Sequence, residues 1–255
     1  MRPADQCAEG LRLQYVPKEY AMIGGNGSAS PAGASDFEAE RRWMVARQIR
    51  QRGIRSARVI EAMETVPRHL FLPPEHAAAA YADTPLPIGE GQTISQPYMV
   101  AAMTEALSLD GHQRVLEVGA GSGYQAAVLS KLARDVIAVE TQPALAATAR
   151  ERLARLGFAN IRVEEGDGSL GWPSGAPYDA ILVAAGAPAI PQPLVDQLAE
   201  GGRLVIPVGP ADHQELLRVT KKEGKITQES LFACRFVPLV GLHGWPSDAT
   251  GSTPS

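Results

Sequence analysis

The residues best suited to chemistry begin with a glycine-rich segment, Glu117–Tyr124, which reads EVGAGSGY. Glycine lets the backbone turn tightly and approach a ligand closely. The segment follows a short apolar run, so it stands at the carboxyl end of an expected strand, where open α/β sheets bind ligands. We therefore expect Gly119, Gly121 and Gly123 to form a cofactor-binding turn.

Acidic residues near this turn indicate which cofactor it holds. Glu140 ends the next apolar run, about twenty residues on, where a carboxylate can accept hydrogen bonds from ribose hydroxyls. Glu117 precedes the first glycine by two residues, where it would repel a pyrophosphate but suit an ammonium group, directly or through water. Asp167, followed by Gly168, could accept a hydrogen bond from an adenine amino group. The GAGSG spacing is one residue shorter than the dinucleotide pattern GxGxxG, which favours a cofactor with a methionine moiety over a dinucleotide.

Each of these residues also has a purely structural interpretation. The glycines could form a tight turn with no ligand, and Glu117 could be an exposed carboxylate at a strand end. Asp167 could be an ordinary turn residue.

An alternation of strands and helices from Gln113 onward must position these residues. Nearly continuous apolar runs predict strands that are covered on both faces, at 114–118, 136–140, 161–165, 179–185 and 203–208. Helices are expected at 124–133, 143–157 and 191–200. Two further strands, 215–220 and 230–237, flank a turn at 221–225. The pattern predicts an α/β fold of Rossmann-like, doubly wound type: a mostly parallel sheet with helices on both faces and an antiparallel C-terminal edge.

The chain before this alternation has a different character. Residues 24–35 read GGNGSASPAGAS, so residues 1–35 are expected to be a flexible N-terminal extension. Ser35 with Glu38 predicts a capping box that opens a helix to about Gln51. Ser56 predicts the cap of a second helix, which ends before Pro67. The expected domain is 36–246, with a helical part at 36–110, a cofactor-binding core at 111–246 and a disordered tail at 247–255.

Composition excludes several other functions. A chain of 255 residues with 45% hydrophobic residues can bury a full core. A net charge of −4 argues against nucleic acid or membrane partners. Cys7 and Cys234 cannot form a disulfide framework, and no apolar run could span a bilayer, so a cytoplasmic protein is expected. The five histidines lack metal-ligand spacing, so no metal is expected.

Four segments together resemble one family. The segment 91–101 reads GQTISQPYMVA, 115–130 reads VLEVGAGSGYQAAVLS, 201–209 reads GGRLVIPVG and 235–241 reads RFVPLVG. They are similar to bacterial-type protein-L-isoaspartate O-methyltransferases, within the Rossmann-like S-adenosylmethionine-dependent methyltransferases. The resemblance runs from Phe37 to Gly244, and the GQTISQP loop is not a general methyltransferase feature.

The resemblance implies an activity and a set of site residues. The activity is methyl transfer from S-adenosyl-L-methionine to the free carboxylate of L-isoaspartyl residues in damaged proteins and peptides, which starts their repair. Ser95 is the implied catalytic residue, Thr93 and Ile94 lie over the cofactor, and Gln92 contacts substrate. The implied cofactor contacts are Glu117, Gly119, Gly121, Gly123, Glu140, Asp167 and Gly168, and the implied substrate wall is Phe236, Val237, Pro238 and Leu239. Val240 departs from the family, because some members have threonine there.

This chemistry needs positioning more than activation. A carboxylate is already ionised at neutral pH, so no strong base is required. Ser95 would hold one carboxylate oxygen so that the other faces the methyl group. A purely structural alternative makes Ser95 the N-cap of a helix that starts at Pro97.

Other functions stay open at this point. One is a methyltransferase of the same fold that acts on a small molecule or RNA. A second is an NAD-dependent dehydrogenase, which the glycine spacing disfavours, and a third is a catalytically silent cofactor-binding module. The sequence leaves the oligomeric state open.

Overall fold

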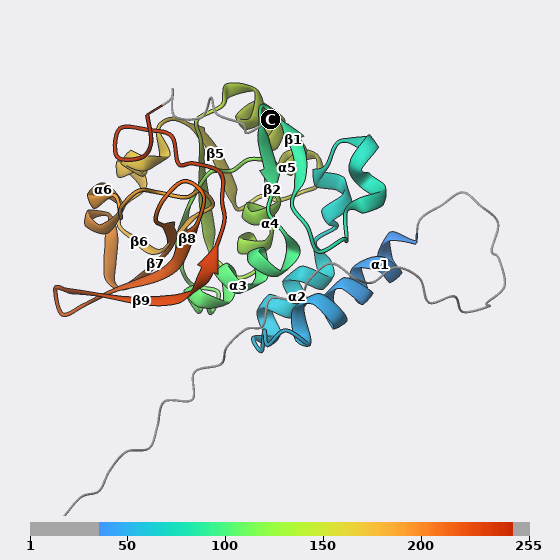
Figure 1. Ribbon diagram of the computed structural model, residues 1–255, viewed down its shortest axis with the longest axis horizontal. Helices are drawn as coiled ribbons and strands as arrows, with labels where there is room; N and C mark the ends of the chain where they lie inside the picture. The colour runs from blue at the N-terminus through green and yellow to red at the C-terminus, as the bar shows by residue number, and fades with distance from the viewer. Residues whose placement is uncertain (1–35, 247–255) are drawn as a thin grey trace, which may run out of the picture. The chain divides into compact units, whose positions relative to one another are not determined.

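A computed structural model describes residues 36–246, and Figure 1 shows their arrangement. A seven-stranded sheet has the order β5-β4-β3-β6-β7-β8-β9, and β1 and β2 form a separate antiparallel pair. The strands are β1 (Leu86–Gly89), β2 (Gln92–Ile94), β3 (Arg114–Val118), β4 (Asp135–Glu140), β5 (Ile161–Glu165), β6 (Tyr178–Val183), β7 (Leu198–Val208), β8 (Gln214–Lys222) and β9 (Lys225–Cys234). Strands β3 to β7 pair in parallel, whereas β8 and β9 are antiparallel, so the predicted fold class is confirmed.

Helices cover both faces of the sheet. They are α1 (Phe37–Met44), the π-helix η1 (Val45–Arg50), α2 (Ala57–Thr65), α3 (Pro97–Leu107), α4 (Tyr124–Ser130), α5 (Pro143–Arg155) and α6 (Gln192–Asp196), with short 3-10 turns η2 (Arg68–Phe71), η3 (Pro74–Ala79), η4 (Gly168–Leu170) and η5 (Pro173–Gly175). Successive β3 residues point to opposite faces: Val115 joins a core built with α2, α3, α4 and α5, and Leu116 joins one built with α6. The continuous apolar strands therefore serve two cores, as their sequence predicted.

The parallel strands bring their carboxyl ends to one edge of the sheet. The ends of β3, β4 and β6 are tied by backbone hydrogen bonds, from Gly119 N–H to the Val139 carbonyl at 2.8 Å and from Ala184 N–H to the Val118 carbonyl at 2.8 Å. Loops that follow these strands are therefore held side by side. This edge carries most of the predicted site residues.

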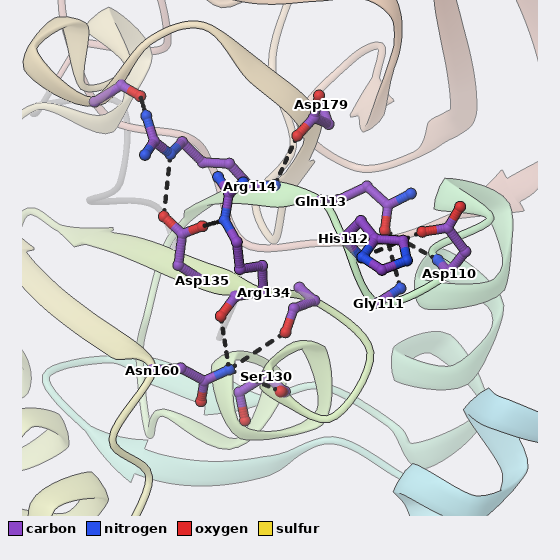
Figure 2. Close-up of polar contacts among 12 residues, drawn as sticks. Asp110, Gly111, His112, Gln113, Arg114, Ser130, Arg134, Asp135, Asn160 and Asp179 are labelled. Carbon is purple, nitrogen blue, oxygen red and sulfur yellow. Dashed lines mark hydrogen bonds and ion pairs between the residues drawn. The ribbon is translucent and has the colours of Figure 1, made fainter.

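A polar network fixes the opposite edge, where β3 and β4 begin (Figure 2). The Arg114 side chain donates to Asp135 at 3.0 Å, and its backbone N–H donates to Asp179 at 2.7 Å. Asn160 donates to the Ser130 carbonyl at 3.0 Å. These contacts link the start of three strands and set their register, so this edge is structural.

The N-terminal helices differ in part from the prediction. The helix expected from Ser35 is α1 continued by η1, and its N-cap is Asp36, whose carboxylate accepts from Ala39 N–H at 3.0 Å. Asp36 is as good a cap as serine and stands one residue nearer the helix, so it takes that role. The Ser56 cap is confirmed, since its hydroxyl accepts from Val59 N–H.

The C-terminal half contains two corrections. The helix predicted over 191–200 is wrong beyond Asp196, because Leu198 pairs with Tyr178 and begins β7. The strand predicted over 230–237 is β9, which begins earlier, at Lys225, so the predicted turn at 221–225 is shorter. It ends at Cys234, opposite Gln214 at the start of β8, and the Gln214 side chain then accepts from Phe236 N–H in place of a further ladder bond. Long-range contacts override local propensity in both places.

Two expected segments, the extension 1–35 and the tail 247–255, lie outside the described residues, as does Ser35. Within 36–246, no helix is both long and apolar enough to cross a membrane.

Candidate active site

The glycine turn has the backbone that its sequence predicts. Gly119, Gly121 and Gly123 all have positive φ, of 90°, 51° and 86°. A side chain at Gly123 would also stand 3.2 Å from Leu153 of α5. The turn therefore depends on glycine and leaves the backbone bare where a ligand can approach.

Glu140 ends β4 and holds this turn. Its carboxylate accepts from Gly121 N–H at 2.8 Å with one oxygen and from Gln142 N–H at 2.9 Å with the other. It is 5% exposed. Each carboxylate oxygen has a further lone pair, so Glu140 can shape the turn and still accept hydroxyl groups from a ligand.

Glu117 is the most unusual group at this edge. It lies on β3 between Ala138 and Leu182, it is completely buried, and neither carboxylate oxygen has a hydrogen-bond partner among the described residues. Burial first, and then the nearby Glu140 carboxylate, raise the pKa of Glu117 well above its ordinary value. Burying an unpaired carboxylate costs free energy, so a cation bound near Glu117 would be stabilised. Because solvent does not reach either oxygen, a direct contact with a ligand would need neighbouring residues to move.

Asp167 and Gly168 follow β5. Asp167 caps η4 by accepting from the Ser169 N–H, and its other oxygen accepts from Leu242 N–H at 2.7 Å. A side chain at Gly168 would stand 2.5 Å from Val118 at the end of β3, so only glycine fits there. Asp167 thus joins the predicted adenine position to the C-terminal segment.

The β1–β2 hairpin lies over the glycine turn. Ile88 of β1 would meet a side chain at Gly121 at 3.3 Å, so the two segments are in close proximity. Thr93 is exposed, Ile94 is buried and Ser95 is half-buried just after β2. The N-cap of α3 is Gln96, which makes no side-chain capping bond, so the alternative that Ser95 caps this helix is wrong.

The segment 236–239 runs along the end of β6. The Gly186 N–H donates to the Val237 carbonyl at 2.8 Å, and Leu239 N–H donates back to the Gly186 carbonyl at 2.8 Å. Leu239 is buried, whereas Phe236, Val237 and Pro238 are half-buried. The predicted substrate wall therefore borders the carboxyl edge.

The structure thus brings most predicted residues to one edge, and it adds others that sequence reasoning missed. Gln214 is buried and donates to the Pro210 carbonyl while accepting from Phe236 N–H. Trp245 donates to the Gly186 carbonyl at 3.0 Å, and Arg152 donates to the Ser122 carbonyl at 2.8 Å. These residues act through long-range contacts that leave no local pattern in the sequence.

These observations test whether the edge suits an adenosine cofactor that carries an ammonium group. The bare glycine turn and the acceptor Glu140 fit such a group directly, and the unpaired Glu117 fits its ammonium once neighbouring residues move. Within residues 36–246, no group of three or more His, Cys, Asp or Glu side chains could hold a metal ion.

The short GAGSG turn, the acidic end of β4 and the mostly parallel sheet with an antiparallel edge fit the Rossmann-like class of S-adenosylmethionine-dependent methyltransferases. More narrowly, the sequence model of the protein-L-isoaspartate(D-aspartate) O-methyltransferase family matches residues 39–244. The chain belongs to this family.

Relatives and solved structures agree. A protein-L-isoaspartate O-methyltransferase from Methanoculleus marisnigri is 56% identical over 85% of this chain and 99% of its own, and one from Geobacter metallireducens is 55% identical over 84% and 99%. A solved protein-L-isoaspartate O-methyltransferase has a TM-score of 0.71 and 30% identity over 81% of this chain and 67% of its own. A Plasmodium falciparum structure described as the same kind of enzyme, in complex with S-adenosyl-L-homocysteine, has a TM-score of 0.68 and 29% identity over 78% of this chain and 98% of its own.

Proposed function

We propose that this protein transfers a methyl group from S-adenosyl-L-methionine to the free carboxylate of L-isoaspartyl residues in damaged proteins and peptides. The observation that carries the proposal is that Ile88 of the β1–β2 hairpin lies against Gly121, so the hairpin that leads into the Ser95 loop contacts the glycine turn. Family membership supports the acceptor. The relatives are named for this activity.

The chain's own residues divide the task of holding the cofactor, which when bound supplies a methyl group on a positively charged sulfur. Gly119, Gly121 and Gly123 offer bare backbone, and Glu140 accepts ribose hydroxyls. Glu117 offsets the ammonium charge. Asp167 accepts from the adenine amino group beside Gly168, while Thr93 and Ile94 cover the cofactor.

Substrate binding is assigned to the Ser95 loop and the segment 236–239. The Ser95 hydroxyl donates to one oxygen of the isoaspartyl carboxylate and orients the second, because the ionised acceptor needs positioning and no base. Gln92 and the half-buried segment 236–238 with Leu239 contact the peptide. Val240 offers no hydroxyl, so any contact made there by threonine in other family members is absent from this chain.

A pair of peptides tests the function. The protein, labelled S-adenosylmethionine and a peptide containing L-isoaspartyl should give a base-labile methyl ester, with at least about tenfold less label on the matched aspartyl peptide. The two peptides differ in the distance of the free carboxylate from the peptide backbone. A site that works by positioning its acceptor should therefore methylate only one of them efficiently. Equal labelling of both peptides would contradict the assignment. Labelling of RNA or a small metabolite alone would favour the rival methyltransferase.

Cofactor affinity should depend on pH through Glu117. Burial raises the pKa of Glu117 and so favours its protonated form in the free protein, whereas a bound ammonium favours its ionised form. Binding therefore releases a proton, so affinity should rise with pH until the pH exceeds the pKa of the free protein. We expect affinity to rise from acidic towards neutral pH, by no more than about tenfold per pH unit because one proton is released, measured by calorimetric titration.

The Glu117→Gln variant is the control for this dependence, because its amide cannot titrate. Its affinity should change little over the same range. The same titration in buffers of different ionisation enthalpy counts the released proton. An affinity that is constant with pH in the parent, or an equal slope in Glu117→Gln, contradicts the assigned role.

Two further expectations accompany the proposal. The partners are damaged proteins and peptides, rather than nucleic acid or membranes, which the net charge of −4 supports. That the protein works in the cytoplasm stays a prediction from sequence.

A further inference from the structure

A cluster outside the predicted site connects both ends of the segment 84–95, which contains β1, β2 and Ser95. Arg52, in the turn after η1, donates to the Asp83 carboxylate at 2.6 Å. Its guanidinium carbon also lies 3.6 Å from the centre of the Tyr98 ring. Arg52 therefore touches the residue before the segment and the first turn of α3 after it.

A second contact closes the same cluster. The Gln96 side chain donates to the Asp83 backbone carbonyl at 3.1 Å. The segment thus leaves Asp83 and returns to it one residue after Ser95. We call Arg52, Asp83, Gln96 and Tyr98 the loop clamp.

The far side of Tyr98 is also supported. Its ring centre lies 6.3 Å from that of Phe232 on β9, the strand that leads to the segment 236–239. Phe232 and Tyr98 are both half-buried. The clamp therefore stands between the Ser95 loop and the strand that precedes the proposed substrate wall.

We infer that Arg52 is a positioning residue for methyl transfer, which fixes Ser95 through Asp83 and Tyr98. An exposed ion pair or a single exposed cation–π contact adds little stability by itself. When one planar guanidinium makes both contacts, it fixes the orientation of Asp83 and Tyr98 relative to each other as well as the distance between them. A small displacement of the Ser95 hydroxyl would lower the rate of the chemical step. The carboxylate that it orients must approach the methyl group in line.

A double-mutant cycle tests this inference, which rests on the proposed function. Single-turnover methylation of an L-isoaspartyl peptide is measured for the parent, Arg52→Ala, Ser95→Ala and the double variant. Arg52→Ala should lower the rate about three- to tenfold and leave cofactor affinity within about twofold of the parent. In the Ser95→Ala background the same change should cause no further fall, because Arg52 acts through Ser95. An equal fractional fall in both backgrounds would overturn the inference.

Arg50→Ala is the matched control. Arg50 is the last residue of η1, two residues before Arg52, and makes an exposed ion pair with Glu64 at 3.2 Å without contact to the clamp. Its removal should leave the rate within about twofold of the parent. A rate loss as large as that of Arg52→Ala would show a general effect of surface charge and overturn the inference.

If the parent protein does not methylate the L-isoaspartyl peptide, the proposed function is wrong, but the loop clamp is still testable. Amide hydrogen exchange over residues 92–96 then decides. Faster exchange in Arg52→Ala than in Arg50→Ala supports the clamp, and equal exchange overturns it.

Discussion

Replacing Ser95 with alanine should lower the single-turnover rate of isoaspartyl methylation about 10- to 1000-fold, with little change in cofactor affinity. The side chain is half-buried at the end of the hairpin that covers the glycine turn, and it does not cap α3. The loss should be smaller than for a general base, because the acceptor carboxylate is already ionised and only its orientation is affected. Rapid-quench measurement of methyl ester, together with calorimetric titration of cofactor, separates rate from binding.

Ser230→Ala supplies the control for this prediction. Ser230 is an exposed hydroxyl on β9 that bonds Glu215, so its removal should leave the rate nearly unchanged. If Ser95→Ala retains the full rate, the hydroxyl does not orient the acceptor. If it weakens cofactor binding as strongly as it slows transfer, its role lies in the cofactor site instead.

The strands of the sheet were predictable because burial on both faces leaves a strong mark in sequence. The run that became β3 matches its predicted limits, since it is mostly apolar and buried between clear turn signals. The limits of β5 also match, although IRVEE carries three charged residues and buries only Val163. The helix limit at Asp196 was not predictable. Residues 197–200 have helical composition, and only the pairing of Leu198 with Tyr178, twenty residues away in the chain, makes them part of β7.

The site residues were predictable where the backbone conformation strongly favours a single residue type. Gly119, Gly121 and Gly123 were found because their positive φ values favour glycine. The isolation of Glu117 was not predictable, because a carboxylate near a strand end is usually solvated, whereas here the residue lies between β4 and β6 and is completely buried. The role of Gln214 was not predictable either, because a single glutamine on a strand forms no sequence motif.

Replacing Glu140 with alanine should weaken S-adenosylmethionine binding by ~1–3 kcal/mol, about a 5- to 150-fold increase in Kd. Two losses combine in this variant. The predicted acceptor for both ribose hydroxyls is removed, and Gly121 N–H loses the partner that holds it at 2.8 Å. Calorimetric titration measures the affinity, and the single-turnover rate at saturating cofactor should fall far less than in Ser95→Ala.

Glu165→Ala is the control that isolates this effect. Glu165 ends β5 in register with Glu140 but is exposed. The Glu165→Ala variant therefore removes an equal charge from the neighbouring strand without altering the glycine turn. Its cofactor affinity should stay close to that of the parent. A Glu140→Gln variant keeps an acceptor oxygen for Gly121 and should lose less affinity than alanine, because the amide can still bind one hydroxyl. If Glu140→Ala binds cofactor as tightly as the parent, or if Glu165→Ala is equally impaired, ribose recognition by Glu140 is wrong and the carboxylate serves only the turn.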